Sequence, residues 1–129
     1  MNGSYLLDTN IIIALFGRDP DIEFQLGRAD VVFVPAIVLG ELFYGSYKST
    51  RVEENLGRIE AFAAQSAIMN CDTDTARHYG RLKDSLRRKG KPLPENDIWI
   101  AALAVQHEMK LVSRDAHFTE VDELIIESW

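Results

Sequence analysis

The stretch "SYLLDTNIII" at residues 4–13 indicates the fold, because it predicts a buried strand followed by a buried helix. It also places a carboxylate, Asp8, inside an otherwise apolar run. Residues 4–7 are typical of a short buried strand, and residues 10–17, "NIIIALFG", favour a buried helix that ends at Gly17. Asp8 therefore lies between a strand and a helix. Buried carboxylates are rare unless they are paired or bound to a cation. Asp8 is thus either a helix cap or part of a site.

The alternation of apolar strands and helices continues along the chain. Further strands are expected at 31–34, 67–71 and 110–113, with a weaker candidate at 123–128. Helices are expected at 19–29, at 36–48, after a capping box at "TRVE" (50–53), between Asp72 or Thr73 and "GKPLP" (90–94), and at 97–108 with Asn96 as cap. This order predicts an α/β fold with a small central, mostly parallel sheet between two helical layers.

Length and composition predict one folded domain over residues 1–129. The chain has 129 residues, of which 47% are hydrophobic and 26% charged, as in ordinary globular proteins. No segment resembles a signal peptide or is long and apolar enough to cross a membrane. The single cysteine, Cys71, excludes an internal disulfide and suits a reducing cytoplasm, and we expect it to be buried and inert.

The charge is unevenly distributed along the chain. A net charge of −6 argues in general against a nucleic-acid partner. However, half of the 14 Lys and Arg residues fall in "RHYGRLKDSLRRKGK" at 77–91. From charge alone, the simplest interpretation of this stretch is the solvated face of a surface helix.

Four acidic residues stand beside strongly apolar sequence, whereas most of the other sixteen have polar neighbours. Asp8 and Asp115 each follow a predicted strand, where sites form in parallel sheets. Glu41 lies within the apolar helix "PAIVLGELFYG", and Asp97 opens the apolar helix "DIWIAALA". Helix capping or the helix dipole explains three of them singly, but a Glu within an apolar helix needs a partner.

If the four acids converge on one cleft, they favour a metal site. Two like charges 4 Å apart repel by about 4 kcal/mol at an effective dielectric constant near 20. Such a group either takes up protons or binds a cation. Its ligands would be carboxylates, with Thr9, Asn10 or Ser113 nearby, and oxygen ligands suit Mg²⁺ or Mn²⁺. Carboxylate-held Mg²⁺ is common in enzymes that hydrolyse phosphodiesters.

Four blocks of the sequence resemble the acidic motifs of PIN-domain proteins, above all the VapC-type toxins of toxin–antitoxin pairs. In chain order they are "LLDTN", "GELFYG", "NDIWIAALA" and "LVSRDAHF", and they span almost the whole chain. The resemblance implies a PIN-like three-layer α/β/α fold and a metal-dependent ribonuclease. It implies an acidic quartet of Asp8, Glu41, Asp97 and Asp115 around Mg²⁺ or Mn²⁺. Asn10 and Ser113 match supporting positions, and Ser113 stands where many relatives have Thr.

The resemblance also implies partners. VapC-type toxins form homodimers, cleave RNA and are held inactive by a small antitoxin that enters the active-site groove. The basic stretch 77–91 then has two further interpretations: it contacts RNA through Arg81, Arg87, Arg88 and Lys89, or it receives acidic residues of the antitoxin. Phe43, Tyr44 and Tyr47 are candidates for a dimer or antitoxin surface.

Two alternatives stay open, and the other chemically interesting residues favour structural roles. An aspartyl-phosphate phosphatase also has an Asp after its first strand, but it needs a second Asp where this chain has Asn10. A non-catalytic protein could use the same acids to bind a structural cation or a partner. The three histidines show no metal-ligand spacing, and His117 is expected to be structural. Trp99 is expected to pack within the protein.

Overall fold

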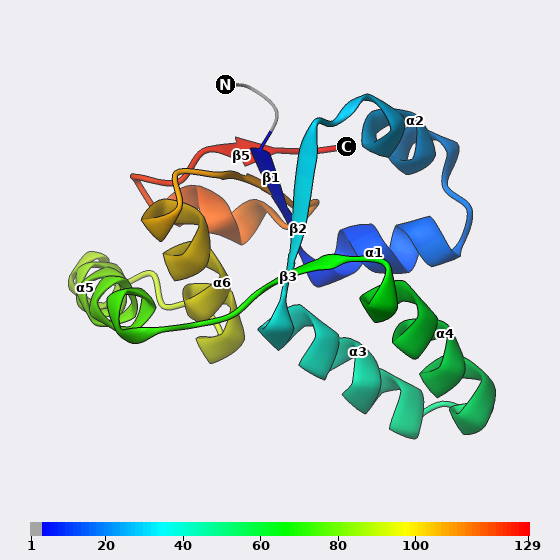
Figure 1. Ribbon diagram of the computed structural model, residues 1–129. Coiled ribbons are helices and arrows are strands. Elements are labelled where there is room, and N and C mark those ends of the chain that lie inside the picture. The colour runs from blue at the N-terminus through cyan, green and yellow to red at the C-terminus, as the bar shows by residue number, and fades with distance from the viewer. Residues whose placement is uncertain (1–3) are drawn as a thin grey trace.

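The computed structural model describes residues 4–129, and in them five parallel strands form one sheet (Figure 1). The strands are β1 (Ser4–Leu7), β2 (Val31–Pro35), β3 (Ala67–Met69), β4 (Lys110–Val112) and β5 (Ile126–Glu127). Their order is β3-β2-β1-β4-β5, and each pair of neighbours is parallel. The predicted parallel α/β sheet is confirmed.

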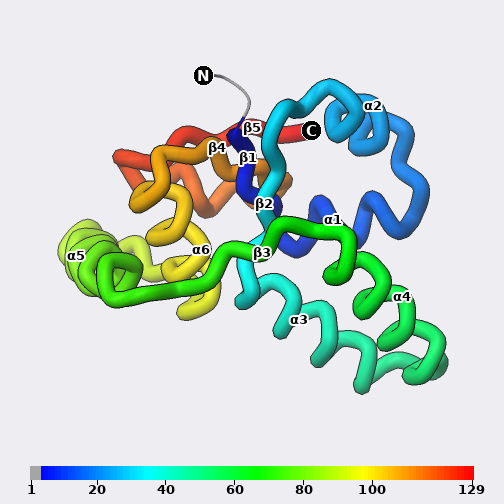
Figure 2. The backbone as a smooth tube through the Cα atoms, in the orientation of Figure 1, coloured from blue at the N-terminus to red at the C-terminus, as the bar shows by residue number. Residues whose placement is uncertain are grey.

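Helices connect the strands and cover both faces of the sheet. They are α1 (Thr9–Phe16), α2 (Pro20–Arg28), α3 (Ala36–Tyr47), α4 (Val52–Ala64), α5 (Thr73–Lys89), α6 (Glu95–Gln106) and the short 3₁₀ helix η1 (Ala116–Glu120). The backbone trace places α1, α2 and α4 on one side of the sheet and α5 with α6 on the other (Figure 2). None of the helices within residues 4–129 is long and apolar enough to span a membrane.

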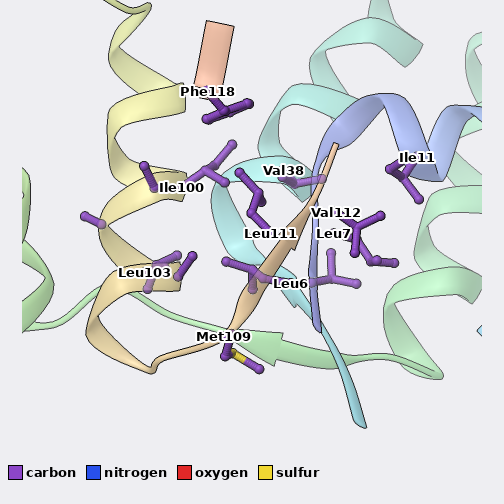
Figure 3. Packing of buried hydrophobic residues seen from close by; sticks show 14 of the residues in the cluster. Leu6, Leu7, Ile11, Val38, Ile100, Leu103, Met109, Leu111, Val112 and Phe118 are labelled. Carbon is purple, nitrogen blue, oxygen red and sulfur yellow. The ribbon is translucent and has the colours of Figure 1, made fainter. Parts of the chain in front are cut away.

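The core explains why the central elements are continuously apolar. Leu6 and Leu7 of β1 and Leu111 and Val112 of β4 are at most 1% exposed, because helices cover both faces of these strands. On α6, the side chains of Ile98 and of residues 100–104 are all buried. Figure 3 shows Ile100 and Leu103 of α6 beside the strand residues. Asp97 therefore lies in the first turn of a helix that is fixed by the core.

The strand order positions the candidate site. The chain moves from β1 outward to β2 and β3, and then returns to the other side of β1 with β4. The order reverses between β1 and β4, and parallel sheets bind ligands beyond the carboxyl ends of strands at such a point. Asp8 directly follows β1, and Asp115 follows β4 by three residues. The fold thus brings together two acids that are distant in sequence.

The helix starts differ from the sequence prediction at two places. The predicted capping box at 50–53 is wrong: α4 begins at Val52 after Arg51, without a side-chain cap, so Glu53 lies one position too early to complete a box. Arg51 pairs with Glu54 instead. Asn96 does not cap α6, because the extended backbone of Pro94 lets the helix begin at Glu95.

Other local predictions fare better, with one exception. Asp72 and Thr75 form a reciprocal capping box at the start of α5, and Gly90 ends that helix with a positive φ of 70°, a conformation that glycine adopts at low cost. The prediction of a buried Cys71 is wrong, because this cysteine is exposed. Strand β3 ends at Met69, so Cys71 lies in the connection to α5 and not in the sheet.

Candidate functional site

Asp8 is the most deeply buried acid of the site. Its side chain is held at the start of α1, where Oδ1 accepts a hydrogen bond of 2.8 Å from the backbone N–H of Thr9. Oδ2 accepts a bond of 2.7 Å from the Ser113 hydroxyl. The residue is only 5% exposed. The capping interpretation of Asp8 is therefore correct, and it is compatible with a role in a site.

Glu41 reaches the same edge of the sheet from α3. The Thr9 hydroxyl donates a bond of 2.6 Å to its Oε1, across 32 positions of sequence. Thr9 thus links two acids, because its backbone N–H binds Asp8 and its hydroxyl binds Glu41. This contact accounts for a carboxylate within an apolar helix.

Ser113 organises the segment that follows β4. Besides donating to Asp8, its hydroxyl oxygen accepts a bond of 3.0 Å from the backbone N–H of Asp115. The Asn10 amide lies 3.5 Å from the same oxygen, and Asn10 Oδ1 accepts a bond of 3.3 Å from the backbone N–H of Arg114. Asn10 and Ser113, the two predicted supporting residues, therefore tie the start of α1 to the loop that carries Asp115.

Asp97 lies in the first turn of α6 and contacts His117 of η1. His117 Nε2 lies 2.7 Å from Asp97 Oδ2, and its Nδ1 lies 2.8 Å from Asp115 Oδ1. Asp115 also caps η1 by accepting a bond from the backbone N–H of His117. The imidazole therefore bridges two acids of the predicted quartet.

Sequence reasoning missed His117 as a site residue, because it lies two positions after Asp115 and has no metal-ligand spacing in the chain. Only the turn of η1 folds its ring back between Asp115 and Asp97. In the structure, the neighbouring Phe118 is fully buried and anchors η1, but no signal in the sequence marks His117.

Burial and like charge act together on two of the acids. Burial raises the pKa of Asp8, the hydrogen bonds from Ser113 and Thr9 lower it, and the charges of Glu41 and Asp115 raise it further. Burial also raises the pKa of Asp97, with His117 acting in the opposite direction and Asp8 and Glu41 adding to the increase. These effects accord with the hydrogen bonds that link the four predicted acids through Thr9, Ser113 and His117.

The donor groups suit a divalent cation. Ligand atoms of Asp97, Asp115 and His117 all lie within 4.8 Å of one another. Asp8 and Glu41 add carboxylates whose charges are felt at Asp97. Two buried carboxylates with raised pKa values, with two further acids beside them, favour a cation that lets them remain ionised together. Oxygen ligands with one imidazole nearby fit Mg²⁺ or Mn²⁺.

A groove adjoins the acids on the α1 and α3 side. It has a volume of about 250 Å³ and is lined by residues that include Thr9, Glu41, Ile13, Phe16 and Ile59. Its walls come from α1, α3 and α4. Ile13 is 57% exposed although it is apolar. We call the sheet edge that carries Asp8, Glu41, Asp97 and Asp115 the acidic edge. At Glu41 it is continuous with an apolar surface.

The predicted aromatic surface is partly supported by position. Tyr44 and Tyr47 on α3 are 64% and 66% exposed, whereas Phe43 packs against the core. Trp99 stacks on Tyr79 of α5 with ring centroids 4.0 Å apart, in accord with its predicted packing role. Of the three aromatic residues predicted for this surface, the two tyrosines are therefore exposed.

The basic stretch forms most of α5, and its cations are paired with acids. Arg81 pairs with Glu123, and Lys89 with Glu120 and Asp122. Arg87 and Arg88 both bind Asp84, at 2.9 and 2.8 Å. The single carboxylate of Asp84 neutralises only one of the two guanidinium groups, so Arg87, Arg88 and Asp84 together retain one net positive charge.

Comparison with known proteins agrees with this geometry. The family model described as PIN domain matches residues 5–124. The chain is 38% identical to the ribonuclease VapC2 of Haemophilus influenzae and 31% identical to the tRNA(fMet)-specific endonuclease VapC of Salmonella typhimurium, with 97% of each chain covered in both comparisons. The structure of DNA-bound VapBC from Salmonella typhimurium superposes with a TM-score of 0.91 at 29% identity, covering 98% of both chains. The sequence resemblance is confirmed, and the chain belongs to the PIN-domain family and, within it, to the VapC proteins.

Proposed function

We propose that this protein is a Mg²⁺- or Mn²⁺-dependent endoribonuclease that acts as the toxin of a toxin–antitoxin pair, with residues 1–129 forming a single PIN domain. One observation carries the proposal: hydrogen bonds through Thr9, Ser113 and His117 link Asp8, Glu41, Asp97 and Asp115 beside the point where the strand order reverses. The names of the relatives, a ribonuclease and a tRNA(fMet)-specific endonuclease, support the same reaction class.

Asp8 and Asp97 are the residues that we assign as the most direct ligands of the cation. Both have fixed side chains, Asp8 through Ser113 and Thr9 and Asp97 through His117. Glu41 and Asp115 complete the carboxylate cage or orient the attacking water. When bound, a divalent cation supplies positive charge that offsets the negative charge developing at phosphorus.

The chain's own residues then position the reactants. A carboxylate of Glu41 or Asp115 accepts a proton from the attacking water, which is directed in line at phosphorus. Thr9 keeps Glu41 in place, and Ser113 and Asn10 keep the Asp115 loop in place. Attack by water should leave a 5′-phosphate and a 3′-hydroxyl. Attack by the ribose hydroxyl would instead give a cyclic 2′,3′-phosphate.

The basic helix supplies the candidate RNA contacts Arg81, Arg87, Arg88 and Lys89. Among them, Arg87 and Arg88 are the best placed, because they share Asp84 and their side chains are about three-quarters exposed, 75% and 74%. Arg81 and Lys89 each have acidic partners of their own. Phosphate contacts of this kind add affinity without sequence preference.

The apolar groove beside Glu41 is our proposed docking place for a segment of a small antitoxin. Its apolar walls and the exposed Ile13 suit an amphipathic segment, and its position lets such a segment reach the acids. The exposed rings of Tyr44 and Tyr47 are proposed to serve this contact or a homodimer. The matched structure from Salmonella typhimurium was solved as VapBC, which supports a partnered protein.

A cleavage assay on total cellular RNA tests the enzyme proposal. Antitoxin-free protein is incubated with Mg²⁺, with Mn²⁺ or with chelator, and folded Asp8→Asn serves as control. We expect discrete cuts that need a cation, are absent in the variant and carry 5′-phosphate ends. Cation binding without any cleavage would instead favour a non-catalytic partner-binding protein.

A further inference from the structure

His117 occupies a position that the acidic quartet alone does not explain. Its ring lies between two of the four acids, and both nitrogens face carboxylate oxygens at 2.7 and 2.8 Å. The residue is held from both sides in the chain. Its backbone N–H is bound by Asp115, and the neighbouring Phe118 is buried completely. These contacts fix the ring between Asp97 and Asp115.

We infer that His117 Nε2 is a nitrogen ligand of the divalent cation and that Asp115 holds the ring through Nδ1. This inference depends on the proposed function, because it concerns the same cation. It adds to Asp115 a second role, that of a carboxylate that orients a metal-binding histidine. Hydrogen-bonded pairs of this kind commonly fix the tautomer and direction of metal-bound imidazoles.

The observed distances suit this arrangement. Two ligand atoms at about 2.1 Å from one octahedral ion, at right angles, lie about 3 Å apart. Asp97 Oδ2 and His117 Nε2 are already 2.7 Å apart, so a rotation of the Asp97 carboxylate off the Nε2 direction admits an ion that both atoms can bind. The proton between these two atoms passes to solvent on binding, because a coordinating imidazole nitrogen must be deprotonated. Nδ1–H continues to donate to Asp115.

A nitrogen ligand makes the site selective between cations. Imidazole binds first-row transition metals well, whereas Mg²⁺ keeps oxygen ligands and water. We therefore expect removal of the ring to weaken Mn²⁺ binding about tenfold and to change Mg²⁺ binding less. A histidine that serves only as a hydrogen-bonded bridge between Asp97 and Asp115 predicts no such difference between the two cations.

The test is pulsed electron paramagnetic resonance of Mn²⁺ bound to the full chain, which detects ¹⁴N nuclei of a coordinated imidazole. The chain has only three histidines, so the source of the signal can be assigned. His117→Gln is the test variant. His107→Gln is the matched control, because His107 is exposed at the opposite end of α6 from Asp97.

We expect an imidazole coupling in the wild type and in His107→Gln, and none in His117→Gln. Bound Mn²⁺ without nitrogen coupling in the wild type would overturn the inference and leave the nuclease proposal intact. Coupling that persists in His117→Gln would overturn it as well. A wild-type protein that binds no Mn²⁺ at all would contradict the proposed metal dependence and, with it, this inference.

Discussion

The acidic edge of the sheet and helix α5 contain the same kinds of charged residue in opposite electrostatic settings. On and beside α5 the acids have basic partners: a hydrogen bond from Arg87 lowers the pKa of Asp84, and one from Lys83 lowers the pKa of Glu95. At the acidic edge, burial raises the pKa values of Asp8 and Asp97, and neighbouring carboxylates add to the increase. Positive charge is thus largely paired with acids on α5, whereas negative charge accumulates at the acidic edge.

The contrast indicates where function lies. Ion pairs on an exposed helix contribute little to stability and are easily replaced. Buried like charges cost stability, so a fold that gathers them needs a compensating ligand. His117 contacts one oxygen of Asp97 and one of Asp115, but it does not contact Asp8 or Glu41 through a hydrogen bond or ion pair among the described residues. Binding of a cation should therefore stabilise the folded protein more at the acidic edge than at α5.

The largest effect is expected from a matched pair of aspartate variants. Asp97→Asn should reduce the rate of RNA cleavage by about 1,000-fold or more, because it removes a charge from the cation site. Asp84→Asn on α5 should leave the rate nearly unchanged. Cleavage of a fluorescent RNA under saturating Mn²⁺ measures both. Similar losses in the two variants would remove the distinction between the regions.

A smaller effect is expected when the support of the acids is changed. Ser113→Ala removes the hydroxyl that binds Asp8 and Asp115 and should lower the cation affinity about tenfold. Ser113→Thr keeps a hydroxyl and should restore most of the affinity. Calorimetric titration with Mn²⁺ provides the comparison. If alanine and threonine behave alike, the hydroxyl does not organise the site.

The apo protein should reveal the cost of gathering the acids. Asp8 has a raised pKa in the folded state, so its contribution to stability is greatest below its unfolded pKa and falls as pH rises through the folded value. At pH 7.5 without metal, Asp8→Asn should therefore be more stable by about 1 kcal/mol, or about 3–5 °C in Tm. Near pH 3.5 the difference should vanish.

Excess Mn²⁺ supplies the control for this stability effect. Binding to the folded state stabilises the wild type, so the order of the two proteins should reverse when Mn²⁺ is added. Thermal unfolding at several pH values, with and without Mn²⁺, follows both changes. An apo variant that is less stable than the wild type at every pH would show that helix capping dominates the role of Asp8.

The smallest effect is expected on α5. Arg87→Gln combined with Arg88→Gln should weaken RNA binding about threefold at low salt. The salt dependence of binding should fall by the equivalent of about one phosphate contact, because Asp84 already neutralises one of the two guanidinium groups. Arg81→Gln should weaken RNA binding less, because Arg81 already pairs with Glu123. Filter binding at several salt concentrations is sufficient. Equal losses from Arg81→Gln would contradict local charge balance.

The strands and the acids were predictable from the sequence for a physical reason. Buried parallel strands leave continuous apolar runs, and a carboxylate that interrupts or follows such a run is conspicuous, as at Asp8 and Asp115. Glu41 was visible for the same reason on its apolar helix. The start of α5 was predicted because its cap uses neighbouring residues, Asp72 and Thr75.

What the sequence did not reveal depends on contacts between distant segments. His117 reaches Asp97 over 20 positions and only through the turn of η1, so no local pattern marks it. Several partners of α5 come from residues 120–123 and from Glu95, which explains why much of the positive charge of a basic stretch is paired in the fold. Cys71 was misplaced because the end of β3 could not be located from composition.

The most direct test of the central claim is calorimetric titration of Mg²⁺ and Mn²⁺ into the wild type, Asp8→Asn and Asp84→Asn at pH 7.5. If the acidic edge exists to hold a cation, the wild type and Asp84→Asn bind alike, and Asp8→Asn loses most of the affinity. Equal binding by all three proteins, or binding by none, would show that the gathered carboxylates do not form a cation site.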